Sequence, residues 1–126
     1  MKRELERLEK IRMLVDAVAD RKGEDVVALD VRQVTSFADT FVLATGSSDR
    51  NVRAIADAVV EAAQGIGAAP LGVEGYEEGR WVLVDLGDSI VHVFLPEVRE
   101  HYALERLYAD APPVELAPAP LRGAAR

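Results

Sequence analysis

Residues 79–94, Gly-Arg-Trp-Val-Leu-Val-Asp-Leu-Gly-Asp-Ser-Ile-Val-His-Val-Phe, decide the fold of this chain. Two segments rich in β-branched and aromatic residues, 80–86 and 89–95, flank the dipeptide Gly87-Asp88. Two such runs around a two-residue loop are typical of a β-hairpin. We therefore predict two antiparallel strands joined by a tight turn.

A two-residue loop also determines which side chains share a face of the hairpin, because directly opposed residues point to the same side. One face is then wholly aliphatic and is expected to lie under helices: Val82, Val84, Leu86, Val91 and Val93. The opposite face mixes an aromatic residue with a carboxylate and an imidazole: Trp81, Leu83, Asp85, Ile90, His92 and Phe94. This mixed face is where we expect the function to lie.

The composition limits the class of protein. With 126 residues, 49% of them hydrophobic, the chain is long and apolar enough for one domain with a packed core. Cysteine is absent, which excludes disulfides, thiolate metal sites and cysteine nucleophiles. No apolar run approaches the roughly 20 residues of a membrane span, and the N-terminus lacks a signal-peptide core. We expect a soluble, cytoplasmic protein with no membrane partner.

The negative charge is concentrated in the middle of the chain. The net charge is −7, and residues 23–108 alone hold six arginines and fifteen acidic residues, without any lysine. Such a body repels the phosphate backbone of nucleic acids and attracts basic surfaces. A basic protein is therefore a more suitable partner than a nucleic acid.

Outside the hairpin, the hydrophobic pattern predicts three helices and three further strands. The helices are expected over residues 2–22, 49–65 and 96–108, and the strands over residues 26–31, 40–45 and 71–74. The strand at 40–45 is continuously apolar enough to be buried on both faces, whereas Pro70 confines 71–74 to a sheet edge. Gly23 is a suitable left-handed stop for the first helix.

These elements define an α/β domain, a mixed β-sheet with flanking helices, over residues 1–108. Residues 109–126 are rich in proline and alanine and offer little to bury. We predict that they form a disordered C-terminal tail.

Three patterns associated with catalysis or ligand binding are present but weak. Gly46-Ser47 before a helix is compatible with phosphate binding, yet a helix-capping serine explains it more simply and is favoured. Asp85 and Asp88 are separated by a turn, which is a poor arrangement for holding a divalent metal. His92 does not oppose Asp85 in the hairpin, which favours a histidine bonded to a neighbour over a general base.

Trp81 has two interpretations that the residues alone leave open. It can belong to the core, or it can anchor a protein interface, where tryptophan, tyrosine and arginine are the usual anchors. The second interpretation gains support if Tyr76, Tyr102 and Tyr108 converge near it.

Several segments of the chain match one known family: 36–41 (Ser-Phe-Ala-Asp-Thr-Phe), 45–48 (Thr-Gly-Ser-Ser), 74–75, 80–88, 91–94 and 96–99 (Pro-Glu-Val-Arg), followed by Tyr102 and 104–107. On these motifs, residues 26–112 resemble the ribosomal silencing factor family, also called the RsfS or Iojap family. Two positions depart from the family pattern: Leu86 stands where tyrosine is usual, and Leu95 where histidine is frequent.

The resemblance implies a translation factor that is not an enzyme and needs no cofactor or metal. Members of the family bind the large ribosomal subunit through its protein fourteen and sterically block joining of the small subunit, which represses translation under nutrient shortage. The family fold is similar to that of nucleotidyltransferases, and its members are often homodimers. Direct nucleic-acid binding is not expected as the main contact.

Carried onto this chain, the resemblance implies a partner-binding patch on the hairpin. Trp81 is expected to be its apolar anchor, Asp85 and Asp88 the acidic partners of basic side chains, and Gly87 the residue that keeps the turn tight. The further members of the predicted patch are Leu86, His92, Tyr102, Glu105 and Tyr76. The change at Leu86 is expected to alter local affinity.

Two other classes of function are compatible with the same residues. The first is a metal-dependent nucleotidyl-transferring or phosphate-binding enzyme that uses Gly46, Ser47, Asp85 and Asp88. The second is a dimeric adaptor with a different basic partner.

Overall fold

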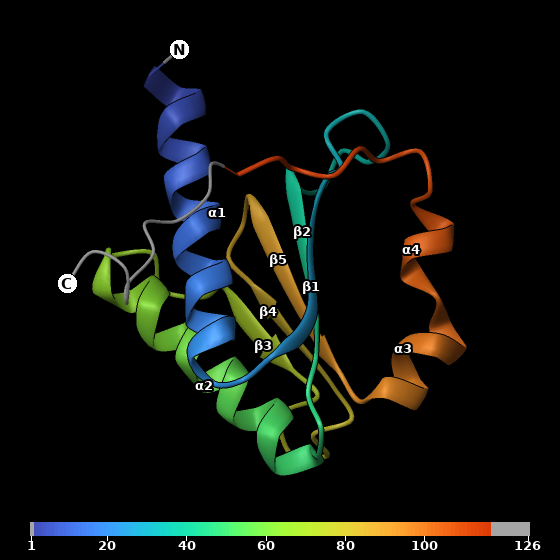
Figure 1. The fold of residues 1–126 in the computed structure, drawn as a ribbon. Coiled ribbons are helices and arrows are strands. Elements are labelled where there is room, and N and C mark those ends of the chain that lie inside the picture. Colours follow the sequence, from blue (N-terminus) through green and yellow to red (C-terminus); the bar gives the residue numbers. More distant parts are fainter. Residues whose placement is uncertain (1, 117–126) are drawn as a thin grey trace, which may run out of the picture.

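A computed structural model describes residues 2–116 of the protein, and they form a five-stranded sheet between two pairs of helices (Figure 1). The elements are α1 (Lys2–Asp20), β1 (Glu24–Asp30), β2 (Thr40–Thr45), α2 (Asp49–Gly65), β3 (Gly72–Glu74), β4 (Trp81–Asp85), β5 (Ser89–Phe94), α3 (Pro96–Tyr102) and α4 (Leu104–Leu107). The strand order is β1-β2-β5-β4-β3, with β2 and β5 parallel and the other neighbours antiparallel. The predicted mixed α/β sheet is confirmed.

The hairpin of β4 and β5 has the predicted register. Trp81 pairs with Phe94, and Asp85 pairs with Ile90. The Leu86 N–H donates to the Ser89 carbonyl, which closes the two-residue turn. Gly87 in that turn has φ 90°, a left-handed conformation that glycine adopts at little cost. The two faces of the hairpin are therefore those predicted from the alternation of residues.

The aliphatic face of the sheet packs under α1 and α2 (Figure 1). Its core joins Val82, Val84, Val91 and Val93 of the hairpin with helix residues such as Ile11, Leu14, Val18, Val52, Ile55 and Val59. All six residues of β2 are buried, as predicted for a strand covered on both faces. Within residues 2–116, none of the helices has the length and apolar character needed to cross a membrane.

The other face of the sheet carries an aromatic core under α3 and α4 (Figure 1). Its buried members include Phe41, Leu43, Ile90, Phe94 and Val98. The prediction of one helix over residues 96–108 was wrong, because Ala103 has φ 47° and divides the segment into α3 and α4. Nothing about an alanine in sequence indicates such a left-handed break.

Within residues 109–116, the segment 112–114 lies along the outer edge of β1. Three backbone contacts hold it there: the Asp30 N–H donates to the Pro112 carbonyl, Leu29 bridges to Pro113, and the Val114 N–H donates to the Ala28 carbonyl. The prediction of a disordered tail was therefore wrong for this part, which covers an otherwise free sheet edge. The remainder of the predicted tail, 117–126, lies outside the described residues.

Two smaller boundaries also differ from prediction. Helix α1 ends at Asp20, and the left-handed residue after it is Lys22 (φ 63°), not Gly23. Gly23 instead leaves room for Val18, because a Cβ at this position would collide with the valine side chain. Strand β1 begins two residues earlier than predicted, and β3 is a short edge strand as expected.

Candidate functional site

Trp81 lies at the start of β4, half-buried between the aromatic core and solvent. Its ring centroid is 4.9 Å from that of Tyr102 and 5.1 Å from that of Phe94. The indole Nε1–H donates a hydrogen bond of 3.1 Å to Nδ1 of His92. The two interpretations of Trp81 are thus not exclusive, because one edge of the ring joins the core while the residue still reaches the surface.

His92 is a buried support for Trp81 and not a surface residue. Its exposed fraction is 5%, and the ring of Phe41 meets it edge to face at 5.1 Å. Because Nδ1 accepts from Trp81, the neutral ring carries its proton on Nε2, which is buried without a hydrogen-bond partner among residues 2–116. Burial lowers the pKa of His92 from 6.5 to about 4, so the ring is neutral at physiological pH. The prediction of a histidine bonded to a neighbour is confirmed.

Lowering the pH from 6.5 to 4 is expected to reduce the free energy of unfolding through His92 by about 3 kcal/mol. In this range the unfolded chain binds a proton at His92 while the folded chain, with its pKa near 4, does not. Stability therefore falls as the pH falls. Urea unfolding at several pH values measures the effect, and His92→Gln is the control that retains the carboxylates. If the free energies of unfolding of wild type and His92→Gln differ by the same amount at every pH from 6.5 to 4, the prediction is contradicted.

Tyr102 and the turn before β4 form a groove next to Trp81. The groove has a volume of about 230 Å³ and is lined by Gly75, Glu78, Arg80, Trp81, Val98 and Tyr102. Tyr102 is 56% exposed, and Glu78 is exposed beside it. On the same face of the sheet, Glu74 pairs with the half-buried Leu83. We call Glu74, Glu78, Trp81, Leu83, Asp85 and Tyr102 the aromatic-acidic surface.

The hairpin turn lies at the other end of β4 and β5 from Trp81, about 13 Å along the strand. The Asp85 Oδ1 accepts a hydrogen bond of 2.9 Å from the Gly87 N–H, so this carboxylate stabilises the turn. Asp88 forms an ion pair of 2.8 Å with Lys10 of α1. The turn therefore brings Asp88 to α1, away from the aromatic-acidic surface.

Two other predicted site residues are also placed away from Trp81. Leu86 is 8% exposed and belongs to the core under α1 and α2, so it offers no surface to a partner. The Tyr76 hydroxyl donates to Asp57 on α2 at 3.1 Å, and this hydrogen bond raises the pKa of the tyrosine. Of the three tyrosines expected near Trp81, Tyr102 contacts it, whereas the ring of Tyr108 packs on Phe41.

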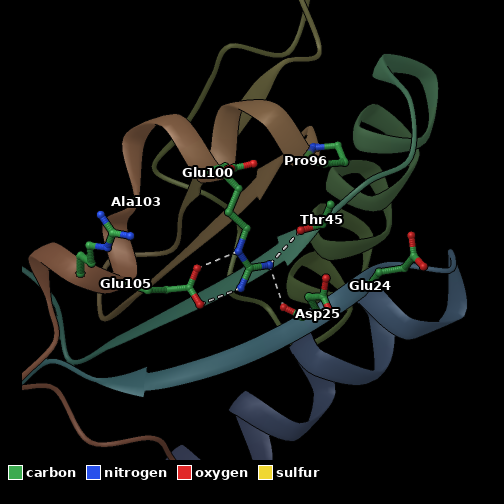
Figure 2. A pocket seen from close by; sticks show the side chains of 9 residues that line it. Glu24, Asp25, Thr45, Pro96, Glu100, Ala103 and Glu105 are labelled. Carbon is green, nitrogen blue, oxygen red and sulfur yellow. Dashed lines mark hydrogen bonds and ion pairs between the residues drawn. The ribbon is translucent and has the colours of Figure 1, made fainter.

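Glu105 is held by Arg99 in a two-point contact. Nε and Nη2 of Arg99 donate to the two carboxylate oxygens at 2.8 and 3.1 Å (Figure 2). The hydrogen bonds from Arg99 keep the pKa of Glu105 below its usual value. This predicted site residue therefore has an internal partner.

The residues of the alternative enzyme do not form one site. Gly46 directly follows β2, and its N–H donates to the Phe94 carbonyl. Asp88 lies at the opposite end of β2, where its backbone carbonyl accepts from the Thr40 N–H. The length of β2 separates these points by about 16 Å. Ser48 caps α2 by accepting from the Asn51 N–H, and the Ser47 N–H donates to the Asn51 side chain, so both serines belong to the start of the helix. Among residues 2–116, no group of three His, Cys, Asp or Glu side chains is arranged to hold a metal ion.

The sequence prediction missed several residues that shape the site. Glu78 and Arg80 line the groove beside Trp81, and Lys10 and Arg99 pair with predicted site residues. Glu78 belongs to a turn whose acidic character was visible in the sequence. The ion pairs join distant segments, and no local pattern indicates them.

Comparisons with known proteins agree on one family. The family model described as "Ribosomal silencing factor during starvation" matches residues 4–126. The chain is 46% identical over 108 residues to the ribosomal silencing factor RsfS of Halalkalibacterium halodurans, covering 86% of this chain and 92% of the relative. It is 42% identical over 106 residues to RsfS of Bacillus subtilis, covering 84% and 90%. A crystal structure of a Chromobacterium violaceum protein superposes with a TM-score of 0.79 at 38% identity, covering 90% of this chain and 94% of that one.

Proposed function

The chain belongs to the ribosomal silencing factor family, and we propose that it binds the large ribosomal subunit and keeps the small subunit from joining it. The contact on the large subunit is its protein fourteen, at the surface that faces the small subunit. Occupation of that surface blocks joining sterically and represses translation, so no catalytic step is required.

The observation that carries this proposal is the aromatic-acidic surface. An exposed tyrosine packs on a half-buried tryptophan with Glu78 beside them in the groove, and Glu74 and Asp85 continue the acidic character along the same face of the sheet. Aromatic anchors within a polar rim are the usual composition of protein interfaces. The surplus of acidic residues over basic ones in residues 23–108 favours a basic partner such as a ribosomal protein.

The mechanism requires a rigid surface and a tight complex. Trp81 is fixed from below by His92 and Phe94, so its ring is held in place before a partner arrives. A surface that is already ordered loses little entropy on binding. The protein then prevents joining for as long as it remains on the large subunit.

Sedimentation with isolated ribosomal subunits tests the proposal. The protein is expected to pellet with large subunits and to stay in the supernatant with small subunits. Protein that remains in the supernatant with large subunits would refute the proposed binding.

The affinity for the large subunit is expected to fall with salt, about three- to tenfold between 0.01 M and 0.15 M, because exposed acidic-to-basic pairs are screened. Binding of the purified partner protein in a salt series measures this effect. The variant Glu78→Gln, which removes one negative charge, is expected to lose less affinity as the salt concentration rises. An affinity that does not change with salt would move the contact to an apolar surface.

We also propose that the protein acts in the cytoplasm as a homodimer, as members of its family often do. Sedimentation equilibrium of the purified chain measures the mass directly. A monomer over the whole concentration range would refute the dimer without affecting the proposed binding.

The enzyme alternative has no observation in its favour. Its four residues occupy opposite ends of the sheet, and the glycine has a packing role: a Cβ at Gly46 would lie 2.7 Å from the Val52 side chain. Titration with magnesium and a nucleoside triphosphate is the direct check, and turnover abolished by Ser47→Ala would reverse this conclusion.

A further inference from the structure

Arg99 is the most extensively bonded side chain of α3. Besides Glu105, its Nη1 donates to the Asp25 carbonyl at 2.7 Å and to Thr45 Oγ1 at 2.9 Å (Figure 2). Its side chain is only 12% exposed. One guanidinium group therefore connects α3 with the beginning of β1, the end of β2 and the beginning of α4.

Few other contacts hold α3 to the body of the protein. Within α3, all of which the structure describes, Val98 is the only buried residue. The two hydrogen bonds from Arg99 to the Asp25 carbonyl and to Thr45 Oγ1 are thus the principal polar attachment of α3 to the sheet. Because the fork of donors engages two elements of the sheet at once, it restricts both the position and the rotation of the helix.

The side chain of the same arginine also spans the connection between α3 and α4. Ala103 has a left-handed backbone at this point, an unfavourable conformation for alanine, and its N–H donates to the Arg99 carbonyl. The ion pair from Arg99 to Glu105 spans Ala103 and holds α4 against α3. Tyr102, which packs on Trp81, is the residue immediately before this bend.

We propose that Arg99 is a positioning residue: it docks α3 on the ends of β1 and β2, and so presents Tyr102 beside Trp81 for the partner. This inference rests on the proposed function, because it concerns the same binding surface. Arg99 itself has no contact with the groove beside Trp81 and acts through Tyr102.

A ligand-binding role for the cavity around Arg99 is not favoured. The cavity has a volume of about 470 Å³, and the carboxylates of Glu24, Glu100 and Glu105 line it together with Asp25. Four N–H donors of the guanidinium already have partners within the protein. The arginine therefore serves the fold locally and is not available to an incoming anion.

A double-mutant cycle with isolated large subunits tests the proposal. Arg99→Ala is expected to weaken binding about tenfold, Arg99→Lys less, and the control Arg106→Ala, on the same cavity, less than about twofold. In a Tyr102→Ala background, Arg99→Ala is expected to change affinity less than about twofold. An equal loss in both backgrounds, or unchanged affinity of a folded Arg99→Ala protein, would overturn the proposal.

A second readout needs no ribosome and separates this inference from the proposed function. Trp81 is the only tryptophan, so its emission reports on the packing of Tyr102. Arg99→Ala is expected to shift that emission as Tyr102→Ala does, and to speed amide exchange at residues 101–107, while the unfolding transition stays cooperative. If wild type does not bind large subunits, the proposed function fails while this readout still decides the role of Arg99. If the Arg99→Ala protein has the same tryptophan emission and the same amide exchange as wild type, the positioning role of Arg99 is overturned.

Discussion

Replacement of Trp81 by alanine is expected to weaken binding to the large subunit by about 2 kcal/mol, a loss of affinity of roughly 30-fold. The substitution removes the ring on which Tyr102 packs and leaves His92 Nδ1 without its donor. The partner thus loses an apolar contact, and the tyrosine loses its fixed position. Titration of labelled protein with isolated large subunits measures the affinity.

The matched control for this substitution is the neighbouring Val82→Ala. Val82 is fully buried under α1 and α2, so its truncation is expected to cost about 2 kcal/mol of stability without changing the aromatic-acidic surface. Both variants are compared at a temperature at which circular dichroism shows them folded. Equal affinities of the folded Trp81→Ala and Val82→Ala proteins would remove Trp81 from the contact.

Replacement of Gly75 by alanine is expected to lower the free energy of unfolding by about 3 kcal/mol. Gly75 has φ 79°, and a Cβ at this position would collide with the backbone carbonyl of Trp81. A backbone oxygen cannot move aside as a flexible side chain can, so the start of β4 must shift. Urea unfolding of the purified variant measures the loss.

The control for Gly75→Ala is Gly72→Ala in the adjoining strand. A Cβ at Gly72 meets nothing within 4 Å, and its φ is not in the left-handed region. This substitution is expected to change the unfolding free energy by less than about 0.5 kcal/mol. Similar losses for the two glycines would show that the close approach at Trp81 does not determine the effect.

The hairpin was predictable because its determinants are local. Successive side chains of a strand point to opposite faces, and the two-residue loop Gly87-Asp88 sets which residues of the two strands are paired. A shift of the register by one residue would have placed Asp85 and His92 under α1 and α2. The same argument correctly separated the aliphatic face from the mixed face. The buried β2 was predictable for a related reason, since its run of apolar residues suits a strand covered on both sides.

The elements that escaped prediction depend on distant contacts. The bend at Ala103 is spanned by the ion pair between Arg99 and Glu105, and Arg99 also bonds to β1 and β2, which no helical period reveals. The segment after α4 has the composition of a disordered chain, yet Pro112 accepts a hydrogen bond at the free edge of β1. In both cases a non-local partner overrides the local preference.

The candidate site was predictable in part. Of the three tyrosines whose convergence would support the interface interpretation, only Tyr102 contacts Trp81, and it does so through packing of α3 and not through any spacing in the sequence. Asp88, Leu86 and Tyr76 were grouped with them on resemblance, and the fold directs these side chains to α1, to the core and to α2. Proximity to the hairpin in sequence is therefore a poor guide to proximity to Trp81.

The joining of purified ribosomal subunits in the presence of the protein tests the central proposal most directly. Light scattering follows joining after large subunits have been incubated with the wild-type protein, with Trp81→Ala or with buffer. We predict that wild type suppresses joining in proportion to the occupancy of the large subunit and that Trp81→Ala requires a higher concentration for the same effect. Joining that proceeds at the buffer rate on large subunits saturated with the wild-type protein would contradict the account.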